Sequence, residues 1–350
     1  MTMIILKQEC NRIKRNRKKL SHFRFDLCLS EVKGMQVKMG KQQATLKNLI
    51  NSKLFRTIVS MVPRKTAYNL EYKRQYGRKI NFDDPKRLTE KLFYLIRYNE
   101  IYNKEFIQKI YDKHKVREYI KEKGLEKILV KQLGHYKTID EIDFSKLPNQ
   151  FALKMTQSSG QNVICTNKEE LDIEEVKNKF RVWAKDNKKK RFFLQSYYFT
   201  DDESITCEEL IKGKNGEIPF DFRVCCCNGE PCFIYCDLDS LDKNNDKKEK
   251  YYRECFDIAW NYLPVDFEHR PRKRVDKAYI QKPNNLEEIL DISRKLAEDF
   301  VFVRIDFYLV EDKIYFGELT PIPGLNGGFS PDEYDFIFGD MLKLPNKKIF

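Results

Sequence analysis

The segment of residues 300–324, "FVFVRIDFYLVEDKIYFGELTPIPG", restricts the possible folds more than any other part of the chain. Two apolar runs flank a short polar turn, which predicts two antiparallel strands joined as a hairpin. Within this apolar pattern the first run carries Arg304 and Asp306, and the second carries Glu318. Burying a charge is costly unless the charge is paired or coordinates a metal. We therefore expect these three side chains to act together.

The register of this hairpin decides whether its two carboxylates share a face. Opposite residues of an antiparallel pair lie on the same face, and a shift of one residue sends a side chain to the other face. We predict a three-residue loop at 311–313, which gives these opposite pairs: Arg304 with Thr320, Asp306 with Glu318, and Tyr308 with Phe316. A two-residue loop is expected to separate the carboxylates.

Two facing carboxylates repel one another unless a cation lies between them. Their hard oxygen atoms suit Mg²⁺, which usually keeps several waters and completes its shell with nucleotide phosphates. This interpretation makes Asp306 and Glu318 metal ligands. The alternative interpretation is an ordinary ion pair with an arginine on a solvated face of the sheet.

The chain carries a formal net charge of +13, and the location of that charge decides which partners it implies. Residues 1–80 contain 20 Lys and Arg against four Asp and Glu, whereas the remaining residues contain 46 against 49. The basic N-terminal segment is suited to anionic lipid, a polyanionic substrate or RNA. A solvated or partly disordered extension is the alternative. The near-neutral body argues against a long nucleic-acid groove, and the sequence has no RRM, KH or zinc-finger signature.

The sequence also predicts the cellular compartment in which the protein works. No apolar run approaches the roughly 20 residues that a membrane-spanning helix needs, and the apolar part of the opening "MTMIIL" is too short for a secretory signal. The ten cysteines show no CxxC spacing, and with four histidines the sequence offers no zinc site or disulfide framework. We expect a reduced, cytoplasmic protein, with peripheral membrane binding through residues 1–79 as a further option.

Composition and periodicity divide the chain into a basic extension at 1–79, a helical region at 80–148 and a mixed region at 149–345. In the mixed region, "CNGEPC" contains an Asn-Gly turn, which is a strong hairpin signal. The patterns predict strands at 150–155, 162–166, 192–197, 205–210, 220–227, 232–237, 301–309 and 314–319, and helices at 169–187 and 285–299. Hairpin-linked strands with flanking helices indicate an α+β fold, not a doubly wound parallel sheet.

A second candidate site follows the first predicted strand of the mixed region. In "FALKMTQSSGQNV", Lys154 precedes a turn of small residues, Ser158, Ser159 and Gly160. The backbone amides of such a turn can approach a phosphate while the lysine supplies charge. The segment is not a Walker A loop, because GxxxxGK[ST] is absent. An ordinary surface turn is the alternative.

Three further patterns carry charges that suit either a site or the solvated surface. In "YDKHKVREYI", Lys113 shares one face of a predicted helix with a second basic residue four positions later. "ITCEELI" places Glu208 and Glu209 in a short strand, and its alternative is an exposed edge. "FDFRVCCC" alternates Asp221 and Arg223 on one face, and its alternative is a surface ion pair.

Taken in order, six segments resemble the ATP-grasp superfamily and, more closely, its TupA-like branch, which is associated with teichuronopeptide and other bacterial surface polysaccharides. The segments are "DKHKVREYI", "LPNQFALKMTQSSGQN", "CEELI", "DFRVCCCNGEP", "FVFVRIDFYLVEDKIYFGELTPIPG" and "FSPDEYDFIFGDML". The quoted segments lie between residues 112 and 342, and the resemblance in their order and spacing covers roughly residues 80–345. Any one of them is unspecific, whereas six in this order are a specific signature.

The resemblance implies an ATP-grasp fold, in which two α+β lobes surround a nucleotide cleft that holds ATP and Mg²⁺. It implies a carboxylate–amine ligase that forms an amide through an acyl phosphate. The substrates would be a glycan or glycan precursor and an amino acid. Two alternatives are an inactive ATP-binding assembly protein of the same fold, and a nucleic-acid or membrane-surface binding protein that uses residues 1–79.

The resemblance also implies a role for each candidate site residue. The nucleotide would be held by Lys113, Lys154, Ser158, Ser159, Gly160, Glu208, Glu209, Leu210 and Asp221. Within this set the two lysines would clasp the phosphates, and the 158–160 loop would close over the γ-phosphate. Residues 208–210 would form the adenine hinge, and Asp221 would contact the ribose. The metal would be held by Asp306, Glu318 and Thr320. Catalysis would fall to Lys154 and Arg304, with Arg304 stabilising the charge of the acyl phosphate.

The chain departs from its branch in one loop and from many other ATP-grasp enzymes at one residue. Its common His-Gly-Ser-Gly loop is changed at the first two positions, to Gln157 and Ser158. Loss of the histidine removes a phosphate contact, and loss of the glycine stiffens the loop. Many ATP-grasp enzymes carry Asn two residues after the metal glutamate, where this chain has Thr320, which is usual in this branch and still offers one oxygen. We expect the changes to affect turnover more than nucleotide binding.

Overall fold

The computed structural model describes residues 62–190, 198–213, 215–238, 251–267, 280–324 and 328–350, together with residues 240 and 248. The chain divides into two compact units, Met1–Val62 and Pro63–Phe350. Every described helix and strand lies in the second unit. Within the described part of the chain, no helix combines the length and the apolar character needed to cross a bilayer.

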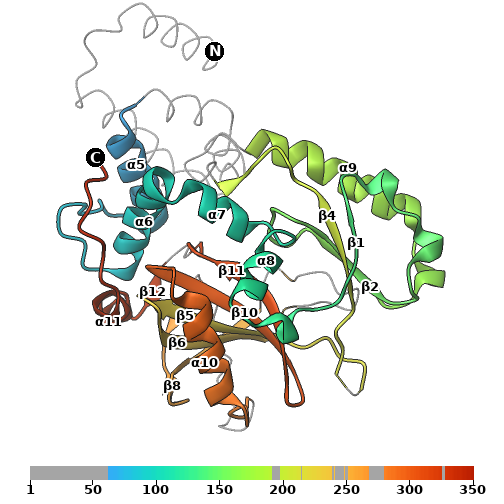
Figure 1. Ribbon diagram of the computed structural model, residues 1–350. Coiled ribbons are helices and arrows are strands. Elements are labelled where there is room, and N and C mark those ends of the chain that lie inside the picture. Colours follow the sequence, from blue (N-terminus) through green and yellow to red (C-terminus); the bar gives the residue numbers. More distant parts are fainter. Residues whose placement is uncertain are drawn as a thin grey trace, which may run out of the picture. The chain divides into compact units, whose positions relative to one another are not determined.

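Helices form the start and the end of the second unit. They are α5 (Arg64–Tyr76), α6 (Leu88–Tyr102), α7 (Lys104–Tyr111), α8 (Val116–Glu122) and, near the C-terminus, α11 (Glu333–Met341). Tyr68 and Tyr72 of α5 are fully buried, and their rings contact Phe93 of α6. α11 lies beside α6 (Figure 1), where the carboxylate of Asp335 accepts hydrogen bonds from the backbone N–H and the hydroxyl of Thr89. Hence α5 belongs to the folded body, although the predicted extension ended at residue 79.

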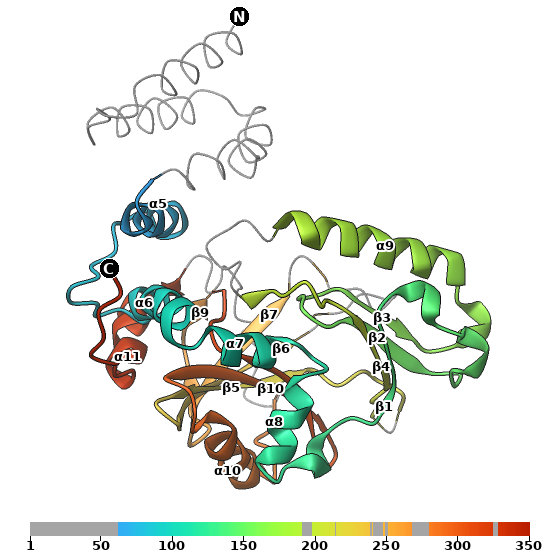
Figure 2. The same cartoon turned by 45° about the horizontal axis from the view of Figure 1, so that its top comes forward.

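The first sheet has four antiparallel strands in the order β1-β4-β2-β3. They are β1 (Gln132–Tyr136), β2 (Phe151–Met155), β3 (Asn162–Cys165) and β4 (Ile205–Glu209). Because side chains alternate along a strand, Phe151 and Leu153 point into the core while Lys154 lies on the opposite face. α9 (Ile173–Lys190) runs along the sheet (Figure 2) and adds Phe180 to the same core.

The second sheet has six antiparallel strands in the order β11-β10-β5-β6-β7-β8. They are β5 (Asp221–Cys227), β6 (Glu230–Leu238), β7 (Tyr252–Asp257), β8 (Tyr262–Leu263), β10 (Phe302–Val310) and β11 (Lys313–Thr320). α10 (Leu286–Ala297) packs against β5, β6 and β10 (Figure 1). The predicted Asn-Gly turn joins β5 to β6, with Asn228 and Gly229 both in the left-handed region that a two-residue hairpin requires.

The remaining elements are short. Two-residue strands β9 (Asp266–Phe267) and β12 (Phe329–Ser330) pair with each other. Four 3-10 turns complete the described part of the chain: η1 (Glu126–Ile128), η2 (Ile139–Glu141), η3 (Phe144–Lys146) and η4 (Lys168–Glu170).

The predicted α+β class is confirmed. Seven of the predicted strands and the second helix occur within two residues of their predicted bounds, whereas α9 begins four residues late because η4 forms a separate turn. The strand predicted at 192–197 lies outside the described residues. β1 and β7 were not predicted, and β1 shows that the first sheet begins inside the region expected to be helical, 80–148.

Candidate active site

The β10–β11 hairpin places Asp306 opposite Glu318, as predicted, but for a different reason. The turn holds two residues instead of three, since Val310 pairs with Lys313. The prediction of a three-residue loop is therefore wrong. The expectation that a two-residue loop would separate the carboxylates is wrong as well.

A β-bulge corrects the register between the turn and the carboxylates. Near the turn Tyr308 pairs with Tyr315, not with Phe316 as predicted, and Gly317 is then the extra residue of the bulge. One extra residue in one strand shifts the register by one, which returns the two carboxylates to the same face. A β-carbon on Gly317 would lie 2.9 Å from the backbone oxygen of Asp306. The bulge therefore requires a residue without a side chain.

Arg304 joins the hairpin groups into one hydrogen-bonded cluster, and it lies opposite Thr320 as predicted. Its Nε donates to Oδ1 of Asp306 over 2.6 Å, and its Nη2 donates to Oδ2 over 2.8 Å. The same Nη2 donates to the hydroxyl oxygen of Thr320 over 3.0 Å. That hydroxyl donates to Oε1 of Glu318 over 2.7 Å. The four predicted residues of the hairpin are thus in direct contact.

Burial and charge act differently on the two carboxylates. The side chain of Asp306 is 8% exposed and that of Glu318 is 30% exposed. Burial raises the pKa of Asp306 against the opposing effect of Arg304 and Arg223. Burial also raises the pKa of Glu318, but the charges of Lys113 and Arg304 outweigh it and hold this pKa below its ordinary value of 4.5. Glu318 is therefore the more accessible and the more readily ionised of the two.

Lys113 connects the hairpin with the loop that follows β2. Its ammonium donates to the backbone oxygen of Ser158 over 2.5 Å and lies 3.8 Å from Oε2 of Glu318. Its backbone N–H donates to the oxygen of Thr156 over 2.9 Å. Because Lys113 lies between α7 and α8, three segments that are distant in sequence meet at one ammonium group.

The loop after β2 is closed at its base, where the N–H of Met155 donates to the oxygen of Gln161 over 3.0 Å. Ser159 and Gly160 are exposed, and Gly160 has a φ of 71°, which favours glycine. The hydroxyl oxygen of Ser158 is buried and has no hydrogen-bond partner among the described residues. A buried polar group without a partner costs about 1–3 kcal/mol. A ligand oxygen at this position would remove that cost.

Gln157 occupies the position of the histidine that is common in the branch. Both the nitrogen and the oxygen of its side-chain amide form hydrogen bonds. Its Nε2 donates to Oδ2 of Asp112 over 3.0 Å and to the hydroxyl of Thr200 over 2.7 Å, and its Oε1 accepts from the N–H of Thr200 over 2.9 Å. Oδ1 of Asp112 accepts in turn from the N–H groups of His114 and Lys115 before α8. The amide of Gln157 therefore anchors the loop to the α7–α8 junction.

Lys154 and Glu208 form an ion pair between the neighbouring strands β2 and β4. Nζ of Lys154 lies 2.6 Å from Oε2 of Glu208, whose side chain is 9% exposed. Nη1 of Arg117 lies 3.5 Å from the other oxygen of Glu208. Glu209, by contrast, is exposed and pairs with Lys131 over 2.7 Å. The two adjacent glutamates thus face different surroundings.

The structure sorts the predicted residues into contact groups. The first group contains Lys113, Ser158, Arg304, Asp306, Glu318 and Thr320. The second is the pair of Lys154 and Glu208. Asp221 accepts a hydrogen bond from Nη2 of Arg223 over 2.7 Å, and Nε of Arg223 lies 3.0 Å from Oδ2 of Asp306, so Asp221 is linked to the first group. The side chains of Ser159, Glu209 and Leu210, and the backbone of Gly160, make no hydrogen bond or ion pair with these groups in the described structure.

The sequence interpretation missed two residues that extend this network. Nε of Arg253 donates to Oδ1 of Asp237 over 2.6 Å, and both side chains are buried. A signal was present, because "YCDLDS" and "YYRECF" each carry a charge inside an apolar run. This is the same pattern that identified Arg304 and Asp306.

The hairpin residues fit a divalent cation that is bound together with phosphates. Among the described residues, no three or more His, Cys, Asp and Glu side chains are grouped so as to hold a metal ion. Asp306, Glu318 and Thr320 nevertheless offer hard oxygen atoms in one hydrogen-bonded cluster. This small set matches Mg²⁺, which takes one or two carboxylates and completes its shell with water and substrate phosphates.

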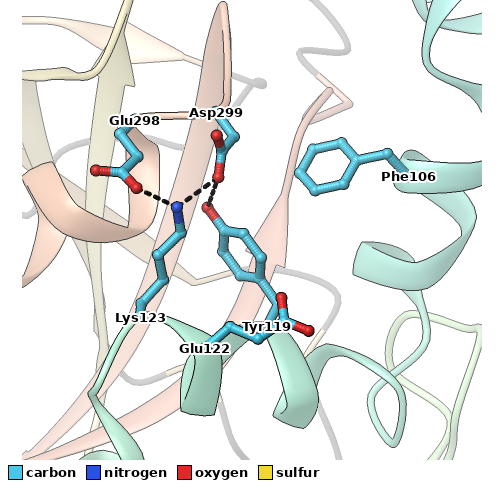
Figure 3. A pocket seen from close by; sticks show the side chains of 6 residues that line it. All are labelled: Phe106, Tyr119, Glu122, Lys123, Glu298 and Asp299. Carbon is cyan, nitrogen blue, oxygen red and sulfur yellow. Dashed lines mark hydrogen bonds and ion pairs between the residues drawn. The ribbon is translucent and has the colours of Figure 1, made fainter.

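A separate pocket of about 470 Å³ adjoins α8 (Figure 3). It is lined by Phe106, Tyr119, Glu122, Lys123, Glu298 and Asp299, none of which is a predicted site residue. Figure 3 shows the ammonium of Lys123 between the carboxylates of Glu298 and Asp299, and the hydroxyl of Tyr119 donates to Asp299 over 3.0 Å. Because these charges pair with one another, we interpret the pocket as a junction between α8 and the end of α10.

Comparison with known proteins gives a family match. A family model described as TupA-like ATPgrasp matches residues 90–343. No curated protein matches the chain. Similar solved structures include D-alanine–D-alanine ligases from Bacillus anthracis (15% identity, 66% of this chain and 66% of that chain, TM-score 0.41) and Helicobacter pylori (16%, 67%, 61% and 0.36). Another is the ADP complex of purK, N5-carboxyaminoimidazole ribonucleotide synthetase (13%, 72%, 60% and 0.39). The chain spans 60% to 66% of the length of these three chains.

Proposed function

The chain belongs to the TupA-like ATP-grasp family, and on that premise we propose that it is an ATP-dependent ligase that joins a carboxylate to an amine. In the proposed reaction a substrate carboxylate takes the γ-phosphoryl group of ATP, which gives an acyl phosphate and ADP. The amine then attacks the acyl carbon, loses a proton and displaces phosphate, which leaves an amide.

The observation that carries this proposal is the cluster at the β10–β11 hairpin. Asp306 lies opposite Glu318, Arg304 bridges them, and Lys113 connects Glu318 to the loop after β2. Phosphoryl transfer depends chiefly on positioning and on stabilising the developing charge. A cluster with two carboxylates, an arginine and a lysine provides both requirements.

Each residue of the cluster has a proposed task. Asp306, Glu318 and Thr320 would hold Mg²⁺, which when bound neutralises phosphate charge. Lys113 and the hydroxyl of Ser158 would bind phosphate oxygens, with Ser159 and Gly160 covering them. Arg304 uses Nε and Nη2 for its contacts with Asp306 and Thr320. We assign its Nη1 to the acyl-phosphate oxygens.

The rest of the nucleotide would be held by strands of both sheets. We propose that Lys154 leaves Glu208 to bind a phosphate, and that Asp221 contacts the ribose. The N–H of Glu209 already donates to Lys131, whereas Leu210 lies just beyond the end of β4. We therefore assign the adenine hinge within 208–210 mainly to the backbone of Leu210.

The substrates are proposed from the family branch. We infer a glycan or glycan precursor and an amino acid, in the modification of a bacterial capsule-like or teichuronopeptide-like surface polysaccharide. The reaction would take place in the cytoplasm, with the basic residues 1–79 available for an anionic membrane surface.

The test incubates the full chain with ATP, Mg²⁺ and a panel of amino acids and uronic-acid acceptors. We expect ADP release that requires one member of each class, and a product whose mass equals the two substrates minus one water. Arg304→Lys serves as the negative control. A lysine cannot reproduce the bidentate contact with Asp306, so ADP release should fall in this variant.

The second candidate is a catalytically inactive ATP-binding assembly protein of the same fold. The Gln157 amide is engaged with Asp112 and Thr200, which favours this candidate, since that amide does not replace the histidine contact expected in the branch. Mg²⁺-dependent ATP binding without ADP release across the panel would support this candidate. Absence of Mg²⁺-dependent ATP binding would contradict both candidates.

A further inference from the structure

Arg223 contacts three carboxylates that lie on three strands. Its Nε lies 3.0 Å from Oδ2 of Asp306 on β10. Its Nη2 donates to Oδ2 of Asp221 on β5 over 2.7 Å, and its Nη1 donates to Asp237 on β6. The side chain of Arg223 is only 7% exposed, so water screens these contacts weakly. Two nitrogens of the guanidinium group therefore donate to carboxylates, while Nε forms an ion pair with Asp306 without a hydrogen bond.

The register of the sheet produces this arrangement. Asp306 lies opposite Arg223 on one side and opposite Glu318 on the other, and Asp237 lies opposite Arg253. Opposite residues share a face. The charged side chains therefore form a band across five neighbouring strands, β11, β10, β5, β6 and β7. We call these residues, Glu318, Asp306, Arg223, Asp221, Asp237 and Arg253, the charged band.

Within the charged band, Asp306 is held from two sides. Oδ1 accepts from Nε of Arg304, while Oδ2 accepts from Nη2 of Arg304 and lies beside Nε of Arg223. A carboxylate has about four acceptor positions and the hydrogen bonds from Arg304 use two of them, so about two remain for a cation or another donor. Rotation of the carboxylate would break a hydrogen bond to Arg304 or lengthen the ion pair with Arg223. Both arginines therefore favour the orientation that Asp306 has in this structure.

We propose that Arg223 is a positioning residue, which fixes the carboxylate of Asp306 in the orientation that would bind Mg²⁺ together with Glu318. The inference rests on the proposed function, because it assumes a cation at the hairpin. Arg223 acts only through Asp306. Arg253 holds Asp237 in the same band but does not touch Asp306, which makes it a matched comparison.

The experiment compares Arg223→Lys with Arg253→Lys in the full chain. Lysine keeps the charge but is a compact point charge without the planar fork of arginine. Calorimetry would measure ATP affinity over a series of Mg²⁺ concentrations and in EDTA, and thermal unfolding would report the fold of each variant. We expect Arg223→Lys to need about 10- to 100-fold more Mg²⁺ for half-maximal ATP binding. Its ATP affinity in EDTA should match the wild type, and so should the Mg²⁺ requirement of Arg253→Lys.

Asp237→Asn provides a second variant if Arg223→Lys does not fold. It weakens one anchor of Arg223 and leaves Arg223 and Asp306 in place, so we expect a smaller shift of the Mg²⁺ requirement in the same direction. An unshifted Mg²⁺ requirement in the folded Arg223→Lys variant, or in Asp237→Asn when it alone folds, would overturn the inference. An equal shift in Arg253→Lys would also overturn it. If the wild type shows no Mg²⁺-dependent ATP binding, the proposed function fails first and the inference fails with it.

Discussion

The two hairpin carboxylates differ in what their removal should cost the folded chain. Asp306 is nearly buried and contacts two guanidinium groups, whereas Glu318 is partly exposed. Asp306→Asn leaves buried arginine charges without their partner, and breaking a buried pair costs about 3–5 kcal/mol. Glu318→Gln should cost about 1 kcal/mol or less, as for exposed pairs. Urea unfolding would measure the free energy of unfolding of both variants. An equal loss of stability in the two variants would contradict the difference in burial between Asp306 and Glu318.

The same two substitutions should nevertheless have a similar effect on turnover. Each removes a proposed Mg²⁺ ligand, and metal stabilisation of the transferring group is worth several kcal/mol, so we expect ADP release to fall by about a hundredfold or more. Initial rates with saturating substrates would be compared at a temperature at which both variants and the wild type are folded. Unchanged turnover in a folded Glu318→Gln variant would rule out Glu318 as a ligand.

The lowered pKa of Glu318 predicts how stability depends on pH. Because its folded-state pKa lies below the ordinary value of 4.5, Glu318 stabilises the native state above that value. This contribution is lost as pH falls through the lowered folded-state pKa. As pH falls below about 5, the free energy of unfolding should therefore fall more steeply in the wild type than in Glu318→Gln. Denaturant titrations at several pH values test this, and parallel curves would argue against the charge effect of Lys113 and Arg304.

At the residue scale, the sequence identified charges inside apolar runs but not what each charge would contact. The pairing of Arg304 with Asp306 could be predicted, because the two residues lie on one face of one strand. The partners of Gln157 could not, since Asp112 and Thr200 are 45 and 43 residues away in sequence. Contacts at such separations are set by how the elements pack, which no local pattern encodes.

At the scale of elements, the β-bulge at Gly317 is what allows a tight turn and facing carboxylates to coexist. Gly317→Ala would place a β-carbon against the backbone oxygen of Asp306, so one strand must move. We expect a loss of about 1–3 kcal/mol of stability, as for overpacking, together with loss of Mg²⁺-dependent ATP binding. Chemical unfolding and calorimetry would measure the two effects.

Gly229→Ala is the control for this prediction. Gly229 has a φ of 86° in the β5–β6 turn, where an added β-carbon meets no atom closer than 3.7 Å. Alanine there should cost about 1–2 kcal/mol through backbone strain, while ATP binding stays at the wild-type level. If Gly317→Ala also retained Mg²⁺-dependent binding, the bulge would not be needed to align the carboxylates.

The elements themselves were predictable where they were apolar and bounded by turn residues. β1, "QLGHY", and β7, "YRECFD", escaped prediction because glycine, histidine and the adjacent charges of Arg253 and Glu254 interrupt their apolar character. β1 also pairs with β4, which is distant in sequence, whereas β7 pairs with the preceding strand, β6. The prediction of the hairpin loop failed for a related reason, since the bulge is fixed by contacts across the sheet and not by the turn.

At the scale of the whole molecule, charge distribution and packing give different boundaries for the basic N-terminal segment. Charge alone suggested a boundary at residue 79, because basic residues continue to that point. The compact second unit begins at Pro63 and includes α5. We therefore propose that the separable extension ends at residue 62.

Two truncated chains test this boundary. A chain that begins at Pro63 keeps every described element, so we expect wild-type thermal unfolding and wild-type affinity for ATP with Mg²⁺. A chain that begins at Ile80 loses Tyr68 and Tyr72, whose buried rings contact Phe93. Removing a large buried aromatic side chain costs about 3–5 kcal/mol, so this shorter chain should unfold at a much lower temperature. If the chain from Pro63 instead lost ATP binding while remaining folded, the basic extension would belong to the nucleotide site, and the second unit alone could not account for the proposed chemistry.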